Sequence, residues 1–173
     1  VSLGLRAWTP FTPGDLATSN TPGAVFEVHL RNSSSSRQSG HLIFSFPGPT
    51  QAEAQRTPES PREELGYSWF KTWVPVAQGP IPARRQFLHD DLQGVTVKSD
   101  KGTEYTLAAL GGDQVRVAGP LGAIGNTWFG SAPEPLADDF GASVTVNFDL
   151  APGERKVVHY VLAWHAPIWR GEG

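Results

Sequence analysis

The sequence predicts an all-β protein built as a sandwich of two antiparallel sheets. Short apolar runs recur along the chain, and the clearest alternates between apolar and polar residues with the two-residue period of a strand. Glycine and proline, 19 and 15 residues of 173, suit many short strands and disfavour long helices. A chain of this length and apolar content can bury one core, so we expect a single domain over residues 1–173.

Alternating apolar residues define the predicted strands. In VTVNFDL, residues 144–150, the valines, phenylalanine and leucine share one face, and threonine, asparagine and aspartate share the other. One face is expected to meet the core and the other to meet water. The predicted strands, in chain order, are residues 24–30, 41–46, 94–99, 104–110, 114–118, 144–150 and 156–164.

The residues between these runs have turn chemistry. SDKG at residues 99–102 and GGD at residues 111–113 supply glycine and aspartate, which favour chain reversals, and we predict a hairpin loop at each. Between the last two strands, Pro152 suits the second position of a turn and Gly153 tolerates a positive φ after it. We therefore also predict a hairpin at the C-terminal end.

Two segments depart from the strand pattern. Residues 50–65, TQAEAQRTPESPREEL, are polar and lack an apolar period, so we predict an exposed insertion that limited proteolysis cuts first. Residues 74–82, VPVAQGPIP, contain three prolines and predict an extended connection between the sheets.

The last predicted strand has no polar face. Valine, tyrosine, leucine and tryptophan occupy one side of residues 156–164, and valine, histidine, valine and alanine occupy the other. A sandwich strand normally wets one side. Either a loop covers the second face or a partner surface packs against it, and we favour the loop.

Composition excludes several classes of protein. The net charge is −3 and no basic cluster exceeds Arg84-Arg85, so a nucleic-acid partner is not expected. No apolar run is long enough to span a membrane, and the N-terminus lacks a signal-peptide pattern. We expect a soluble chain and slightly favour the cytoplasm, although the absence of cysteine leaves the compartment open. The absence of methionine favours a processed product or a segment of a longer chain.

No catalytic or metal-binding constellation is visible, and no metal or cofactor is expected. His89, Asp90 and Asp91 are adjacent, and we interpret them as a solvated turn rather than a metal site. Asp138 and Asp139 offer too few oxygens for a calcium loop. Glu27, Glu104 and Glu154 could pair as glycosidase carboxylates, but nothing isolates one in a pocket. No GxSxG motif accompanies the candidate triad histidines, which are His29, His41, His159 and His165.

Six tryptophans are a high count for this length. Tryptophan serves as a sugar-stacking platform, but buried cores and interfaces also use it. From position, we assign Trp164 to the core, and Trp8 and Trp169 to an interface or to anchoring of the chain ends. Three others stay open between the core, an interface and a sugar platform: Trp69, Trp73 and Trp128.

The two ends of the chain resemble the N-terminal domain of glycoside hydrolase family 116, the family of non-lysosomal glucosylceramidase and β-glucosidase. The family motif has an aromatic residue, Ser-Pro-Phe, then spaced Pro, Asp, Ser and Pro, and an apolar strand that ends near Asn. Thr9 replaces the usual serine here. The other matching positions are Trp8, Pro10, Phe11, Pro13, Asp15, Ser19, Pro22, Phe26 and Asn32. LAPGERKVVHYVLAWHAP, residues 150–167, is similar to the strand pair that closes the same domain.

The resemblance implies a β-sandwich that precedes an (α/α)6 catalytic barrel carrying the glutamate nucleophile and the aspartate acid/base of a retaining β-glycosidase. No position of this chain matches the catalytic motifs, so no catalytic residue is carried over. The chain would end at Gly173 where the linker to the barrel begins. The expected docking face comprises residues 8–22, with Trp8, Pro10, Phe11, Asp15 and Ser19, together with Val157, Val161 and Trp169.

Three interpretations therefore compete. The first is a non-catalytic accessory domain of a family 116-like β-glucosidase or glucosylceramidase, whose partner is the barrel. The second is a free-standing carbohydrate-binding module. The third is a small glycoside-active enzyme of unrecognised class.

Overall fold

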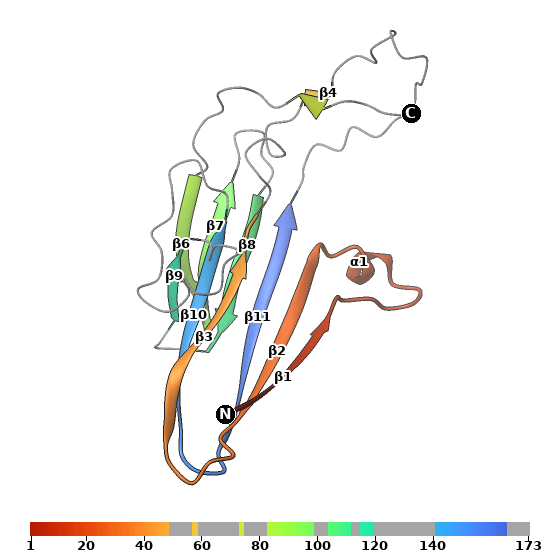
Figure 1. The fold of residues 1–173 in the computed structure, drawn as a ribbon. Helices are drawn as coiled ribbons and strands as arrows, with labels where there is room; N and C mark the ends of the chain where they lie inside the picture. Colours follow the sequence, from red (N-terminus) through yellow and green to blue (C-terminus); the bar gives the residue numbers. More distant parts are fainter. Residues whose placement is uncertain are drawn as a thin grey trace, which may run out of the picture.

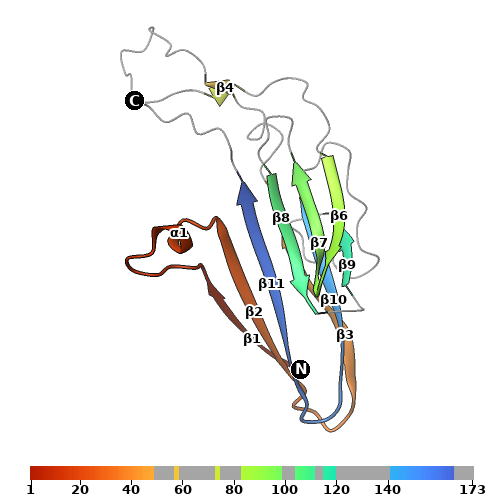
Figure 2. The same ribbon diagram turned by 180° about the vertical axis from the view of Figure 1, so that it is seen from behind.

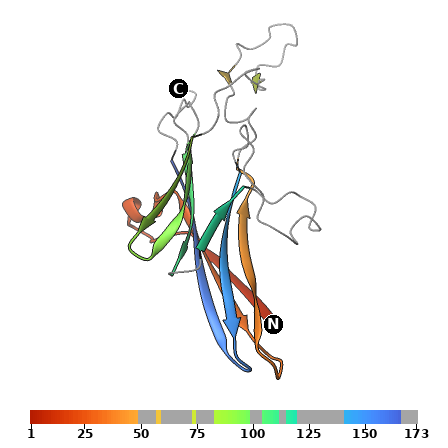
Figure 3. The ribbon, with the colours of Figure 1, turned by 90° about the vertical axis from the view of Figure 1, so that its left-hand side faces the viewer.

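The computed structural model describes residues 1–48, 83–98, 104–111, 115–119 and 141–165, together with the backbone of two short strands. Within these residues the chain forms antiparallel sheets, and the two larger ones pack face to face (Figure 1, Figure 3). This confirms the all-β sandwich.

The larger sheet has six strands in the order β1-β2-β11-β8-β7-β6 (Figure 2). Their bounds are β1 Ser2–Trp8, β2 Gly23–Arg31, β6 Ala83–His89, β7 Leu92–Lys98, β8 Glu104–Leu110 and β11 Arg155–His165. The smaller sheet has the order β3-β10-β9, with bounds β3 Gln38–Phe46, β9 Val115–Ala118 and β10 Ala142–Leu150. Two further strands, β4 Thr57–Pro58 and β5 Trp73–Val74, pair with each other, and α1 spans Leu16–Ser19.

All seven predicted strands are confirmed, with bounds that differ by at most three residues. The prediction missed β1 and β6, the two edge strands of the larger sheet, and the two-residue strands β4 and β5. All seven residues of β1 are exposed, and most of β6 is exposed as well. The sequence of β6 carries no apolar alternation, whereas β1 places Leu3, Leu5 and Ala7 on one face, a signal that the prediction overlooked.

The core lies between the two sheets. Val144 and Leu150 of β10 face Leu107 of β8 and Tyr160 of β11, and each of these four side chains is fully buried. Phe44 of β3 stacks on Tyr160, with ring centroids 5.3 Å apart. The Tyr160 hydroxyl donates a hydrogen bond of 2.7 Å to the carbonyl of Leu42, which ties the sheets together, and burial raises the pKa of this phenol.

The predicted C-terminal hairpin is wrong. β10 pairs with β3 and β9, whereas β11 pairs with β2 and β8, so the corner between them carries the chain from one sheet to the other. The hairpin loop predicted at residues 111–113 is wrong for the same reason, because β8 and β9 lie in different sheets. Alternation indicates which face of a strand is buried, but it does not identify the neighbouring strand.

The local chemistry of the corner is confirmed. Gly153 follows Pro152 with a φ of 79°, and the Glu154 amide donates to the Ala151 carbonyl at 3.0 Å. The Glu154 carboxylate accepts a 2.7 Å hydrogen bond from the Ala151 amide, which closes the turn from the other side. A turn is defined by four consecutive residues, so the sequence predicts it correctly regardless of which sheet the next strand joins.

The predicted solvated turn at His89-Asp90-Asp91 is also confirmed. His89 pairs with Leu92, so Asp90 and Asp91 form a two-residue turn between β6 and β7, and Asp90 has a φ of 51°. β7 and β8 then pair in register as a hairpin, although its tip at residues 99–102 lies outside the described residues. The insertion predicted at residues 50–65 and the connection predicted at 74–82 also lie outside them, apart from the backbone of β4 and of Val74.

Candidate functional site

The loop between β1 and β2, residues 9–22, is held together by its own side chains. Asp15 caps α1, and its carboxylate accepts hydrogen bonds from the Thr18 amide at 3.1 Å and the Thr18 hydroxyl at 2.6 Å. These hydrogen bonds lower the pKa of the Asp15 carboxyl, and the bond from the Thr18 hydroxyl has the largest effect. Ser19 closes the loop, because its hydroxyl donates to the Thr12 carbonyl and accepts from the Thr12 amide, both at 3.0 Å.

The same loop presents apolar side chains to water. Phe11 is 74% exposed and Leu16 is 77% exposed, while Pro10 is partly buried. Trp8, at the end of β1, is 40% exposed, and the Arg6 guanidinium lies 5.6 Å from its ring centre. Asp15 and Ser19 therefore shape the loop, and Phe11 and Leu16 are its most exposed large apolar side chains.

Register places three of the predicted docking residues on one surface. We call the face of the six-stranded sheet that points away from the three-stranded sheet the outer face. Trp8 pairs with Val25, and Val25 pairs with Val161, so these side chains form a row across the outer faces of β1, β2 and β11. Val157 lies on the same face of β11, four residues along the chain, and is 43% exposed.

The structure shows what covers one of the two apolar faces of β11. Val158 and Tyr160 point into the core, whereas Val161 on the outer face is half-buried. Figure 3 shows the three-stranded sheet on one side of β11 only. No described strand covers the outer face of β11. The choice between a covering loop and a partner surface therefore stays a prediction.

A half-buried carboxylate lies next to this row. Glu27 on β2 contacts His29 on the same strand, with Oε1 and Nε2 2.5 Å apart, and its Oε2 lies 3.9 Å from Nε2 of His159 on β11. Arg6 of β1 is the register partner of Glu27 on the other side. Among the residues that the structure describes, no group of three acidic, histidine or cysteine side chains could hold a metal ion.

The candidate glycosidase carboxylates do not meet. Glu27 is the register partner of His159, and Glu104 is the register partner of His165 on the far side of β11. Six residues of strand separate these two positions (165 − 159), or roughly 20 Å at about 3.3 Å per residue. Glycosidase pairs lie about 5 to 10 Å apart, so this pair does not fit that chemistry. Glu154 is bound within its turn, as described above.

The structure describes the side chains of two of the six tryptophans, Trp8 and Trp164. Trp164 was expected in the core, but its side chain is 46% exposed, so that expectation is wrong. It lies near the end of β11, beyond the last register partner of β11 on β2, so that only β8 still pairs with the strand there. The remaining predicted residues, Trp69, Trp128, Trp169, Asp138 and Asp139, lie outside the described residues, as does the side chain of Trp73.

The sequence prediction overlooked the charged end of the outer face. Arg31 and Arg155 lie directly opposite each other on β2 and β11. No short motif marks such a pair, because its members are 124 residues apart (155 − 31) and meet only through strand pairing. The Glu27 and His29 pair does carry a signal, since residues two apart on a strand share a face.

The chain matches a family model over residues 1–172, described as beta-glucosidase 2, glycosyl-hydrolase family 116 N-term. No curated protein matches the chain. No helix in the described part of the chain is long and apolar enough to cross a membrane.

Proposed function

The chain belongs to the family of N-terminal domains of glycosyl hydrolase family 116, and on this premise we propose that it is a non-catalytic accessory domain of a β-glucosidase or glucosylceramidase. It packs on the (α/α)6 catalytic barrel of the parent protein. The barrel supplies the nucleophile and the acid/base, and this domain supplies a docking surface.

The separation of the carboxylates supports the non-catalytic part of the proposal. Glu27 is engaged by two histidines and lies on an open sheet face, and Glu104 lies 3.5 Å from Lys98. Hydrolysis of a glycoside needs a second carboxylate within about 10 Å and a site that holds the sugar between the two. The described residues provide neither arrangement.

The exposed apolar groups support the docking part, and the N-terminal loop is the single observation that carries it. Phe11 and Leu16 are about three-quarters exposed, yet hydrogen bonds through Asp15 and Ser19 hold the loop that carries them. A loop ordered in advance loses little entropy on contact, so most of the gain from burying these side chains remains as affinity. The Trp8, Val25 and Val161 row extends the apolar surface onto the sheet.

Two measurements test the proposal. The isolated chain should not hydrolyse an aryl β-glucoside, and turnover that survives repurification would contradict the non-catalytic role. The catalytic domain, produced separately, should bind the chain. The Phe11→Ala and Leu16→Ala double variant should weaken this binding by roughly tenfold or more, because two apolar anchors are lost.

Leu88→Ala is the matched control. Leu88 is 71% exposed on β6, the opposite edge strand of the same sheet, so its removal should leave docking unchanged. Equal weakening by both changes would place the docking surface elsewhere.

A carbohydrate-binding role is the second candidate, and the exposure of Trp164 favours it. An exposed indole offers a flat face on which a pyranose ring can stack. Saturable quenching of tryptophan fluorescence by a glucoside, lost in Trp164→Ala, would support this role. If the chain neither binds the barrel nor turns over substrate, this candidate takes first place.

A further inference from the structure

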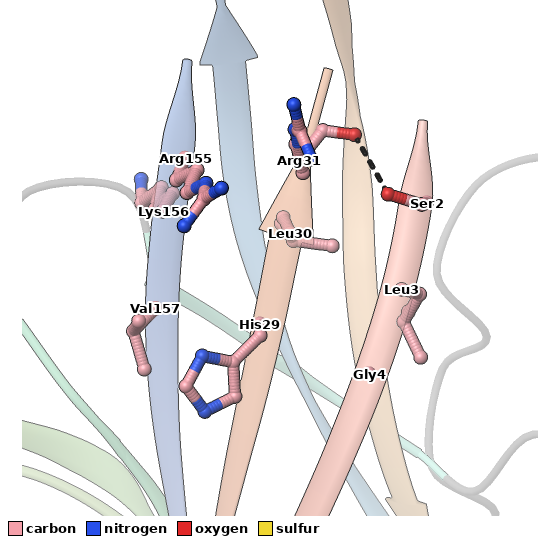
Figure 4. A pocket seen from close by; sticks show the side chains of 9 residues that line it. All are labelled: Ser2, Leu3, Gly4, His29, Leu30, Arg31, Arg155, Lys156 and Val157. Atoms are coloured by element: carbon pink, nitrogen blue, oxygen red, sulfur yellow. Dashed lines mark hydrogen bonds between the residues drawn. The ribbon is translucent and has the colours of Figure 1, made fainter. Parts of the chain in front are cut away.

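A groove of about 530 Å³ lies on the six-stranded sheet, at the end where β1 and β11 begin and β2 ends (Figure 4). Register places six of its lining residues on the outer face, in two rows across β1, β2 and β11. The first row is Ser2, Arg31 and Arg155, and the second is Gly4, His29 and Val157.

The first row concentrates positive charge. Arg31 and Arg155 are register partners, and both are exposed. Like charges directly opposite each other on an antiparallel pair are destabilising. Among the residues that the structure describes, no ion pair joins either arginine to a carboxylate.

The carboxylates at this end of the sheet have other partners. Asp149 pairs with Arg37 at 2.9 Å, and Glu154 accepts from the Ala151 amide at 2.7 Å. Glu27, in the row beyond the second, contacts His29. The positive charge of Arg31 and Arg155 is thus left uncompensated within the described part of the chain.

The second row leaves room above the strands. A Cβ atom placed on Gly4 would have only the Cβ of His29 near it, at 3.9 Å, so the sheet is open at this position. Val157 forms an apolar side of the groove and is 43% exposed. The Ser2 hydroxyl makes only a long contact of 3.4 Å with the Arg31 carbonyl, and it can rotate toward a ligand.

We propose that this groove binds a phosphate dianion, either inorganic phosphate or the phosphate end of a small monoester. A guanidinium fork matches the oxygens of a phosphate. The phosphate charge of nearly −2 balances two guanidinium groups, whereas the single negative charge of a carboxylate does not. The groove is in the size range of small-ligand sites and is larger than phosphate alone, so the organic part of a monoester has space beside Val157. This inference goes beyond the accessory role and does not depend on docking.

The test is a calorimetric titration of the 173-residue chain with inorganic phosphate and, separately, with glycerol phosphate. The pH is held at about 7.5, where phosphate is mostly a dianion, and sodium chloride keeps the ionic strength constant. We expect saturable binding. Arg31→Ala and Arg155→Ala should each weaken it by at least about tenfold, because each removes a charged hydrogen-bond donor.

Arg116→Ala is the matched control, since Arg116 is an exposed strand arginine on the other sheet, opposite Thr145. It should leave the affinity unchanged, and circular dichroism verifies that every variant is folded. Equal affinity for both probes identifies free phosphate as the ligand, and tighter binding of glycerol phosphate identifies a monoester. Absence of saturable binding, or equal losses in the control and in the groove variants, overturns the proposal.

Discussion

The side-chain amide of Asn32 donates a 3.0 Å hydrogen bond to the carbonyl of Leu150, a residue 118 positions later in the chain. Asn32 follows β2 and Leu150 ends β10, so this bond joins the two corners at which the chain crosses between the sheets. The Asn32 backbone adds two more hydrogen bonds of 2.9 Å. Its amide donates to the Glu154 carbonyl, and its carbonyl accepts from the Gly153 amide.

Asn32→Ala should lower the free energy of unfolding by about 2 to 4 kcal/mol, because the side chain is fully buried and completely hydrogen-bonded. The change leaves the Leu150 and Ser36 carbonyls without its amide, and the Ser34 amide and hydroxyl without its oxygen. Urea unfolding measures the loss. Ser33→Ala, an exposed change in the same corner, should stay within about 0.5 kcal/mol. Similar values for the two variants would contradict the role of Asn32.

Gly94→Ala should destabilise the protein by about 3 kcal/mol or more, because a Cβ there would lie 2.2 Å from the Leu107 carbonyl oxygen and 2.6 Å from the Ala108 Cα. Both are backbone atoms of β8, so the strands themselves would have to separate. Gly4→Ala is the control, since its site is open, and it should be neutral or slightly stabilising. Thermal and chemical unfolding compare the two, and an equal tolerance of both changes would be inconsistent with close approach at Gly94.

Phe148→Ala should cost about 3 kcal/mol, the lower end of the range for a core phenylalanine. The ring is only partly buried and packs over Gly40, whose added Cβ would lie 2.8 Å from it. Chemical denaturation gives the value. The neighbouring change Ser39→Ala, at an exposed position of β3, should have little effect. A loss below about 1 kcal/mol for Phe148→Ala would mean that this end of the core is already open to water.

Tyr160→Phe should remove part of the alkaline sensitivity of the fold. The unfolded chain releases the phenol proton near the ordinary pKa of 10.0, while burial raises the pKa in the folded chain. Above about pH 10 the folded state therefore holds a proton that the unfolded state has lost, and stability falls by up to roughly 1.4 kcal/mol per pH unit. Below this pH the Tyr160 contribution is constant.

Unfolding free energies at pH 9, 10 and 11 for the two proteins isolate that contribution. The variant should be less stable at pH 9 by about 1 kcal/mol, because the Leu42 carbonyl loses its donor, and the gap should narrow as the pH rises. A gap that stays constant to pH 11 would contradict the burial of the phenol.

Local signals in the sequence determined the strands and the turns. The alternation at residues 144–150 predicted the buried face of β10, and Pro152 with Gly153 predicted the turn that follows. Both signals act between residues close in the chain, so they need no knowledge of the partner strands. β6 escaped prediction because its sequence carries no apolar alternation, whereas β1 alternates at Leu3, Leu5 and Ala7 and was overlooked.

The candidate surfaces depended on the tertiary structure to different degrees. Trp8 and Phe11 could be singled out from the sequence, and Asp15 with Ser19 could be found as polar loop residues, but their hydrogen bonds to Thr18 and Thr12 could not. The family resemblance at the chain ends agrees with the family match over residues 1–172. The docking role of these residues stays a prediction.

The sequence by itself determined an all-β chain, its buried faces and its turn residues, because periodicity and turn chemistry are local. Only the tertiary structure decided that β10 and β11 lie in different sheets, that Asn32 joins their corner to the end of β2, and that Arg31 faces Arg155. The Asn32 bond to Leu150 and the pairing of Arg31 with Arg155 each join residues more than 100 positions apart. A pleated strand presents the same alternation to any neighbour, so the choice of neighbour is made by the packing of the whole sandwich.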